Sequence, residues 1–243
     1  MGRVYDVPGL PRELVEAFCA SPELPDPLPA EPFSLLAGWF EEEKGAKRTP
    51  NPDAMSVATV DVDGRVSNRI VLCRGMDAGA GFVTFFTNRE GRKGRDLRAT
   101  GRAAACFHWD ATDRQARLEG VVTLSPDAES DAYFASRRWE SRLSAWTSDQ
   151  SAPTSGRKAL LEKMAGVLGR LGLTPEGLMA QRERAAIPRP PHWGGFRLHA
   201  SRVELWLGGT GRLHDRAEWV REVVVEGSGN VRCGEWRCTR LQP

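Results

Sequence analysis

Three side chains near the C-terminus are spaced so that they could act together on a ligand. Arg212, His214 and Arg216 follow one another at intervals of two in the stretch "ELWLGGTGRLHDR", residues 204–216. If the second half of this stretch is a β-strand, the three share one face, because successive side chains alternate between the faces of a strand. Two guanidiniums and an imidazole repel one another, so the cluster is a candidate anion site. An outer strand whose arginines pair with neighbouring carboxylates is the simpler alternative.

Two further groups of cations are candidates for anion binding. The segment "NREGRKGRDL", residues 88–97, places Arg92 and Lys93 between two glycines, just before a predicted helix. Glycine lets the backbone approach a ligand closely, and a helix N-terminus favours anions. A solvated basic turn is the commoner meaning of such a run. Arg69 and Arg74 form the other group, although a regular strand would put them on opposite faces because their numbers differ by an odd number.

A fourth group has the spacing of a helix face. Tyr133, Arg137 and Ser141 are spaced i, i+4, i+8, so one helix would present a phenol, a guanidinium and a hydroxyl together. A forked cation with hydroxyls beside it suits a phosphate. A surface arginine next to a half-buried tyrosine would give the same pattern. The stretch "WTSDQS", residues 146–151, adds hydroxyls and an amide, which favour binding of polar groups over acid–base catalysis.

Motifs for other kinds of chemistry are missing from the sequence. There is no nucleophile elbow, Walker loop or dinucleotide fingerprint. The five cysteines contain no Cys-x-x-Cys, and the four histidines have no zinc-site spacing, so no metal is expected. Many phosphate-binding groups beside few catalytic ones fit a protein whose chemistry is done by a bound phosphorylated cofactor.

Charge and hydropathy also limit the choice of partner and compartment. The formal net charge of +2 indicates neither a nucleic-acid nor a membrane partner. No apolar run approaches the roughly 18 residues of a membrane span, and the N-terminus lacks the pattern of a secretion signal. Unpaired cysteines are typical of a reducing cytosol, so we expect a cytoplasmic protein.

The elements that must position these groups are mostly short strands. The chain of 243 residues is long enough for one large domain, which we predict over residues 33–243. Residues 1–32 are rich in proline, so we predict that they form a loosely held, flexible arm with one short helix. Alternating segments with turn signals indicate a barrel or sandwich with added helices, so the fold class is mainly β with helices (α+β). The predicted strands are 55–74 (a hairpin turning at Asp63-Gly64), 81–88, 103–109, 114–124, and three candidates in 194–207, 212–227 and 231–243. The predicted helices begin with 32–47, whose apolar residues recur at helical spacing and form one stripe (Phe33, Leu36, Trp39 and Phe40). The others are 127–138 with Ser125 as N-cap and Pro126 as first residue, one starting at Ser155, and a helical piece after Leu173.

Nine segments in this order resemble the pyridoxine (pyridoxamine) 5'-phosphate oxidases, from about residue 30 to the last. The family members are FMN enzymes with a split-barrel fold that make pyridoxal 5'-phosphate. The resemblance therefore implies an FMN-binding split β-barrel whose C-terminal strands serve dimerisation and the active site. The matching segments are "RIVLCR", "FFTN", "GRKGRDL", "RQARLEG", "YFASR", "AWTSDQS", "WGGFRL", "ELWLGGTGRLHDR" and "RLQP".

The resemblance also implies a role for each matching position. FMN would lie at the interface of a homodimer, with part of its site from the other subunit. Arg212 and His214 would lie over the substrate ring and are the catalytic candidates. The implied FMN-binding residues are Arg69, Ile70, Val71, Leu72, Arg74, Phe86, Thr87, Arg92, Lys93, Gln115, Gln150, Ser151, Trp206 and Arg216. The implied substrate-binding residues are Arg74, Tyr133, Arg137, Ser141, Arg212, Leu213 and His214.

The implied reaction is an oxidation of phosphorylated B6 vitamers in vitamin B6 biosynthesis or salvage. Pyridoxamine 5'-phosphate and pyridoxine 5'-phosphate would give pyridoxal 5'-phosphate, with O2 reduced to H2O2. A related FMN oxidase of the phenazine-biosynthesis type, or a non-catalytic flavin- or pyridoxal-phosphate-binding protein, stays open as an alternative. The sequence leaves open the preference between amine and alcohol, and whether a second pyridoxal-phosphate site exists.

The sequence departs from the family pattern at three places. Arg74 stands where the family usually has lysine, and arginine prefers bidentate geometry. The N-terminal arm lacks the Arg-x-x-Tyr-type segment that closes over the substrate in family members. The stretch 157–193 is longer than expected and has no role assigned by the resemblance.

Overall fold

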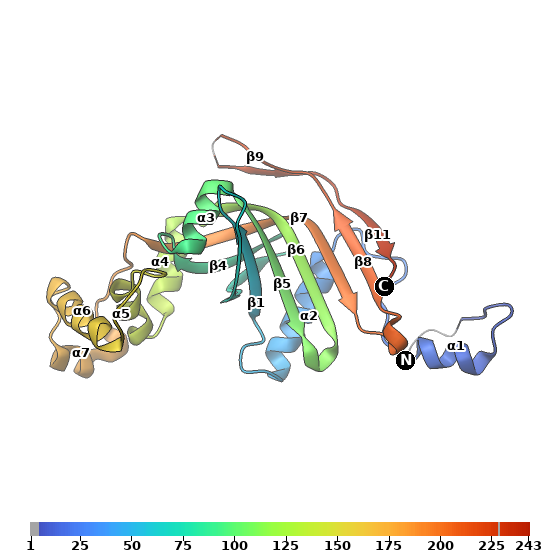
Figure 1. The fold of residues 1–243 in the computed structure, drawn as a ribbon, viewed down its shortest axis with the longest axis horizontal. Helices are drawn as coiled ribbons and strands as arrows, with labels where there is room; N and C mark the ends of the chain where they lie inside the picture. The colour runs from blue at the N-terminus through green and yellow to red at the C-terminus, as the bar shows by residue number, and fades with distance from the viewer. Residues whose placement is uncertain (1–4, 228) are drawn as a thin grey trace.

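Nine of the strands form one antiparallel sheet in the computed structural model, which describes residues 5–227 and 229–243. The sheet order is β11-β8-β7-β6-β5-β1-β2, with β4 beside β7 and β3 beside β4, and it curls into the half-barrel seen in Figure 1. The separate ribbon of β9 and β10 lies above it. The strands are β1 Ala54–Val60, β2 Val66–Leu72, β3 Gly75–Asp77, β4 Phe82–Asn88, β5 Arg102–Trp109, β6 Arg114–Leu124, β7 Trp193–Leu207, β8 Asp215–Val220, β9 Val223–Val225, β10 Val231–Cys233 and β11 Arg237–Leu241.

Seven α-helices are found in the described part of the chain, and five of them lie at the two ends of the sheet. Figure 1 shows α4 to α7 gathered at one end of the sheet and α1 at the opposite end. No described helix combines the length and apolar character needed to cross a bilayer. The helices are α1 Arg12–Cys19, α2 Phe33–Ala46, α3 Arg92–Thr100, α4 Asp127–Ser136, α5 Trp139–Thr147, α6 Arg157–Arg170 and α7 Pro175–Gln181.

The predicted hairpin and the predicted apolar helix are both confirmed. Strands β1 and β2 pair from Val60↔Val66 outward, and Gly64 takes a positive φ of 81° in the turn between them. Helix α2 buries its predicted stripe against the concave side of the sheet, together with Phe85, Phe107 and Phe196. Burial of one such side chain contributes roughly 1.5–3 kcal/mol, so this helix closes the core of the half-barrel.

Strand β7 is the long central element of the fold. Its first half pairs with β4 and its second half with β8, while β6 runs beside it from Phe196 to Leu207. The β6–β7 register shifts between Glu119 and Gly120. A Cβ on Gly120 would lie 2.0 Å from the carbonyl oxygen of His199, so only glycine fits this bulge. The bulge therefore depends on a residue without a side chain.

The stretch 157–193 forms a small second core. Leu143 of α5 packs with Val167 of α6, Leu178 of α7 and the residues Ala185 and Ile187 that follow. Arg142 is buried beneath this group and donates to the carbonyl oxygens of Glu183 and Ala185. These contacts fix the position of α5 from a segment about 40 residues further along the chain.

Part of the N-terminal segment is bound to the C-terminal strands. Leu24 is 1 % exposed, and its backbone N–H donates to Asp215 Oδ2 at 2.7 Å. Trp219 Nε1 of β8 donates to the carbonyl oxygen of Pro29 at 2.9 Å. The predicted short helix is confirmed as α1, which lies beside the turn 210–212. Residues 24–29 are therefore tied to β8 in this structure.

Several predicted boundaries are wrong in detail. Pro126, not Ser125, is the N-cap of α4, and the buried Ser125 hydroxyl has no partner among the described residues. Helix α4 ends at Ser136, and helix α6 starts at Arg157. The short strand β3 was not predicted. The last two strand candidates are four strands, because the chain turns after Val220 and again after Cys233.

His199 on β7 makes the stability of the fold depend on pH. Its side chain is buried, and its Nε2 lies 3.0 Å from Thr123 Oγ1. Burial, and then Arg197 and Arg221, lower the pKa of His199 to about 4. Since an exposed histidine has a pKa of about 6.5, the unfolded chain binds the proton first as the pH falls. The neutral imidazole therefore stabilises the fold fully above pH 6.5, and this contribution is lost between pH 6.5 and pH 4.

We expect His199→Gln to flatten the loss of stability between pH 6.5 and pH 4. Urea unfolding at several pH values measures this, and the slope from one such histidine is at most roughly 1.4 kcal/mol per pH unit. Glutamine retains a group that can bond to Thr123 but does not titrate. The control is the exposed His108→Gln, which should follow the unchanged protein. Equal slopes for both variants would contradict the prediction.

Candidate active site

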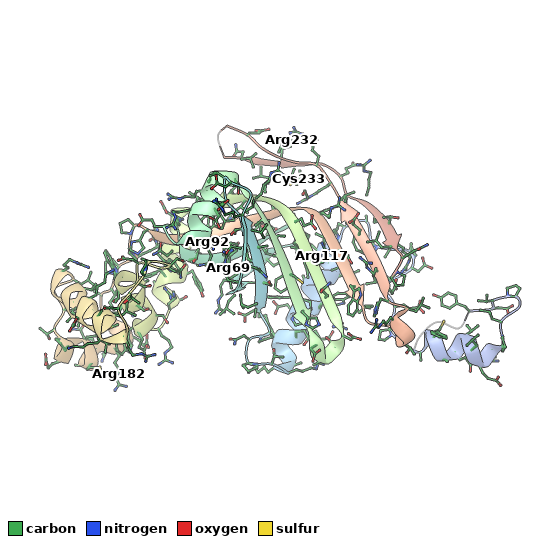
Figure 2. The ribbon with its side chains drawn as sticks, in the orientation of Figure 1. Arg69, Arg92, Arg117, Arg182, Arg232 and Cys233 are labelled. Carbon is green, nitrogen blue, oxygen red and sulfur yellow. The ribbon has the colours of Figure 1, made fainter. Side chains whose placement is uncertain are left out.

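A cavity of about 610 Å3 lies where the end of β2 meets β4, α3, α4 and α5. Its volume is within the range of about 300–1,000 Å3 typical of ligand sites. Figure 2 shows Arg69 and Arg92 beside α3 at this end of the sheet. The predicted residues that line the cavity are Arg69, Ile70, Val71, Leu72, Arg74, Phe86, Thr87, Lys93, Tyr133, Arg137, Ser141 and Gln150. Six lining residues were not predicted, and four of them (Asn88, Ala145, Ser148 and Trp193) fall inside the segments that carried the resemblance; the other two are Arg138 and Ser144.

The cavity wall is cationic. Among the described residues it contains no aspartate or glutamate, and its cations are Arg69, Arg74, Lys93, Arg137 and Arg138. Such a wall favours an anionic ligand.

The α3 end of the cavity holds a half-buried ammonium group. Lys93 Nζ donates to Thr87 Oγ1 at 2.9 Å and also to Gln150 Oε1. Burial, and then the charge of Arg69, lower the pKa of Lys93 to about 8. The neighbouring Arg92 backbone N–H donates to Ser151 Oγ at 3.2 Å. Arg69, the second cation at this end, donates to Thr59 Oγ1, Ser67 Oγ and the Val57 carbonyl oxygen. The α3 end therefore combines a helix N-terminus with two cations whose hydrogen-bond partners are neutral.

The opposite end is an aromatic wall that carries a second guanidinium. Phe86 stacks on Tyr133 at 4.2 Å and on Trp193 at 5.5 Å between ring centroids. The Arg137 guanidinium carbon lies 4.7 Å from the Trp193 ring centroid, and burial lowers the pKa of Arg137. Its Nη1 is buried with no partner among the described residues. A buried donor without a partner is costly, so this atom indicates a missing acceptor.

The Tyr133, Arg137 and Ser141 group is brought together differently from the prediction. The three do not share one helix, because the backbone is extended at Arg137 (φ −76°, ψ 149°) and α5 begins at Trp139. The corner between α4 and α5 nevertheless faces the cavity, and all three side chains line it. Arg69 and Arg74 also reach the same cavity, because β2 ends at Leu72 and strand alternation does not extend to Arg74.

A second cluster lies across the middle of the sheet. Gln115 on β6, Trp206 on β7 and Arg216 on β8 are direct neighbours in the strand register. The buried Glu204 accepts from Arg216 at 2.8 and 2.9 Å and from Arg117 at 2.9 Å. None of these residues lines the cavity, and Figure 2 shows Arg117 further across the sheet than Arg69.

Arg212 and His214 do not lie on a strand, so the predicted shared face with Arg216 is wrong. Thr210–Arg212 form a 3-10 turn in which Gly211 and Arg212 have positive φ values of 63° and 65°. His214 Nδ1 accepts the Gly209 backbone N–H at 3.1 Å, and its ring lies 4.7 Å from that of Trp206. Arg212 and Leu213 are exposed. The turn thus presents these side chains beside the second cluster.

Of the predicted FMN residues, Arg92 and Ser151 also lie outside the lining of the main cavity. Ser151 lines an adjoining cavity of about 400 Å3 on the other side of Gln150. Apart from Arg92 and Ser151, the predicted residues therefore form two groups in one chain, namely the cavity group and the group made of Gln115, Trp206, Arg212, Leu213, His214 and Arg216.

The curled sheet and its helices define an α+β split barrel, the fold class expected from the sequence. Residues 42–168 match the family model described as pyridoxamine 5'-phosphate oxidase, and residues 193–243 match that of the pyridoxine 5'-phosphate oxidase C-terminal dimerisation region. The chain belongs to the pyridoxamine 5'-phosphate oxidase family.

Individual relatives agree with this assignment. The pyridoxine/pyridoxamine 5'-phosphate oxidase of Cupriavidus metallidurans is 45% identical over 213 residues, which cover 88% of this chain and 89% of the relative. That of Rhodospirillum rubrum is 42% identical over 217 residues, with 88% and 96% covered. PhzG from Burkholderia lata 383, solved with tetrahydrophenazine-1-carboxylic acid, has a TM-score of 0.73 at 32% identity, with 90% and 95% covered. A related FMN binding protein from Nostoc punctiforme shares the fold (TM-score 0.61, 17% identity, 86% and 96% covered).

Proposed function

We propose that the chain is an FMN-dependent oxidase that converts pyridoxamine 5'-phosphate and pyridoxine 5'-phosphate into pyridoxal 5'-phosphate and reduces O2 to H2O2. The observation that carries the proposal is a cavity with cations at both ends and an aromatic wall. FMN and the B6 substrate each carry a phosphate and an aromatic ring. If their rings stack on each other, their phosphates need cations at the two ends of the cavity. Free thiols at all five cysteines are consistent with a cytoplasmic enzyme of vitamin B6 biosynthesis or salvage.

The residues at the α3 end fit the phosphate of FMN. Arg69 and Lys93 have neutral partners there, and the α3 N-terminus adds its backbone N–H groups. The edge of β2, with Ile70 to Leu72, would support the isoalloxazine ring. When bound, FMN would supply the redox chemistry by taking up a hydride from the substrate carbon and passing the electrons to O2.

The residues at the α4–α5 corner fit the phosphate of the substrate. Arg137 offers the unpartnered Nη1, and Tyr133 and Ser141 line the cavity beside it with their hydroxyl-bearing side chains. Arg74 closes the same region from the end of β2. Charge-assisted bonds from planar guanidiniums would fix the substrate in one orientation, and positioning is a large part of the protein's contribution to such a reaction.

The second group would complete the site in a homodimer, with FMN at the subunit interface. Five of its six residues lie in 193–243, the stretch that matches the dimerisation region. In this proposal Gln115, Trp206 and Arg216 contact FMN held by the partner subunit, and Arg212, Leu213 and His214 cover the substrate ring. His214 Nδ1 accepts a backbone N–H, so neutral His214 carries its proton on Nε2, from which it can donate.

The structural likeness to PhzG favours one alternative, an FMN oxidase of the phenazine-biosynthesis type. An anaerobic experiment separates the two. The FMN-loaded protein is mixed with pyridoxamine 5'-phosphate while the flavin absorbance is followed. Bleaching, followed by recovery and pyridoxal 5'-phosphate on admission of air, is the expected result. An unchanged flavin with both B6 substrates would overturn the proposal and favour the phenazine-type oxidase or a binding protein.

We expect the affinity of the FMN-free protein for FMN to fall as the pH rises above about 8. Phosphate binds the protonated form of Lys93, whose pKa in the free protein is lowered to about 8 by burial and Arg69, so binding above this pH requires uptake of a proton. The fall approaches about tenfold per pH unit. Titrations followed by flavin fluorescence measure it. Lys93→Arg should remove the dependence, and riboflavin, which lacks the phosphate, should not show it. A loss shared by riboflavin would contradict this role.

A further inference from the structure

Arg74, which stands where the family usually has lysine, is tied to a carboxylate just outside the cavity. Arg74 Nη1 donates to Asp53 Oδ2 at 2.6 Å. The Asp53 side chain is 15% exposed and that of Arg74 34%. Asp53 is absent from the cavity lining, so it contacts Arg74 without facing the ligand space.

Asp53 is itself held in place by its neighbours. Its carbonyl oxygen accepts the Cys73 backbone N–H at 2.8 Å, which joins it to the chain just before Arg74. The preceding carbonyl, that of Pro52, accepts from Trp109 Nε1 at 2.9 Å, and Trp109 is buried in the core. The carboxylate therefore stands on a rigid part of the backbone, at the start of β1.

The other side of the guanidinium faces the aromatic wall. The Arg74 guanidinium carbon lies 6.0 Å from the centroid of the Tyr133 ring, which belongs to the cavity. A guanidinium presents five N–H donors in a planar fork, so a bond at Nη1 fixes the direction of the remaining donors. A lysine ammonium has no such fork and would gain no comparable orientation from Asp53.

We propose that Asp53 is a positioning residue for substrate phosphate. It turns the fork of Arg74 so that the free donors point toward the phosphate site shared with Arg137. The inference rests on the proposed function, because it takes the substrate to be a phosphorylated B6 vitamer. Asp53 also carries a negative charge that repels phosphate, so orientation and repulsion act in opposite directions. We infer that orientation prevails, because the carboxylate charge is already paired with Arg74.

Binding of pyridoxal 5'-phosphate to the FMN-loaded protein separates these two effects. Asp53→Ala should weaken binding by about tenfold, as expected for a ligand-binding group that has lost its fixed geometry. Asp53→Asn, which can still accept from Nη1, should restore most of the affinity. The effect should vanish for pyridoxal, which has no phosphate, and in an Arg74→Ala background. In steady-state assays KM should rise with kcat nearly unchanged.

The controls keep the outcome decisive. Asp63→Ala removes the carboxylate of an exposed Asp–Arg pair in the β1–β2 turn and should leave binding unchanged. Tighter binding by both Asp53 variants would show that repulsion prevails and would overturn the inference. Equal weakening by Asp53→Ala in the Arg74→Ala background would also overturn it, because Asp53 would then act on the fold. If the unchanged protein neither binds pyridoxal 5'-phosphate nor oxidises its precursors, the proposed function fails, whatever the variants do.

Discussion

Replacement of Arg137 by alanine is expected to weaken pyridoxal 5'-phosphate binding on the order of 100-fold, with little loss of stability. A charge-assisted bond to phosphate is worth roughly 1.5–3 kcal/mol, and the upper part of this range corresponds to a loss of about 100-fold. The fold should tolerate the change, because Arg137 Nη1 has no partner among the described residues that would be left unpaired. The contacts of the guanidinium with the rings of Trp193 and Phe134 are lost. Titration calorimetry and thermal unfolding of the same samples measure both effects.

Two variants serve as references for this result. Arg137→Lys keeps the charge but not the fork, so we expect an affinity between those of the unchanged protein and the alanine variant. Arg138 is the matched neighbour, because its side chain is 78% exposed and already paired with Glu140. Arg138→Ala should therefore have an effect of only a few fold. A loss as large as that of Arg137→Ala would assign the phosphate to a different part of the cavity.

Arg212→Ala is expected to slow flavin reduction on the order of 100-fold while FMN binding changes little. Arg212 is exposed on the turn before β8 and does not line the cavity of its own chain. In the proposed dimer it covers the substrate, so its loss disturbs the alignment of the reacting groups and leaves the FMN phosphate site intact. Stopped-flow absorbance gives the reduction rate, and fluorescence titration gives FMN affinity. Equal losses in both would contradict this role.

Mixed dimers test whether Arg212 acts across the subunit interface. Arg137 and Arg212 belong to the two different groups of the site. If each site takes its cavity from one chain and Arg212 from the other, a hybrid of the two variants contains one site with both substitutions and one with neither. Random reassociation makes half of the dimers hybrids, so about a quarter of the full activity should return. No recovery from two inactive parents would place both residues in the same site of one chain.

Local patterns predicted those parts of the molecule that depend on neighbouring residues. The hairpin at Asp63-Gly64 and the apolar stripe of α2 follow from turn chemistry and helical periodicity, and both are confirmed. The corner at Arg137 could not be found in this way, because α5 is fixed by Glu183 and Ala185, more than 40 residues away. Asp53 was missed for a similar reason, since it meets Arg74 only when β1 and β2 pair.

In the candidate site too, features fixed by neighbouring residues were predicted, and features fixed by distant parts of the chain were not. Twelve of the residues that line the cavity were predicted, and all of them except Ser141 lie in segments with a resemblance, because each segment carries its own side chains into place. The resemblance implied that part of the FMN site comes from the other subunit. Local patterns could not show that Gln115, Trp206 and Arg216 lie apart from the cavity, because this depends on the path of the whole sheet. The expected shared face of Arg212, His214 and Arg216 failed because the chain turns before Asp215, with Gly211 and Arg212 at positive φ.

Strand β7 begins at Trp193, in the cavity, and carries Trp206, in the second cluster, thirteen positions later. At about 3.3 Å per residue, this fixes a separation along the strand of roughly 43 Å. In the proposed dimer, the path along this one strand, which includes the bulge opposite Gly120, would therefore set the distance between the two active centres. Insertion of a single residue would reverse the faces beyond it and misplace one half of each site at once. The length of this strand is thus a shared dimension of both sites.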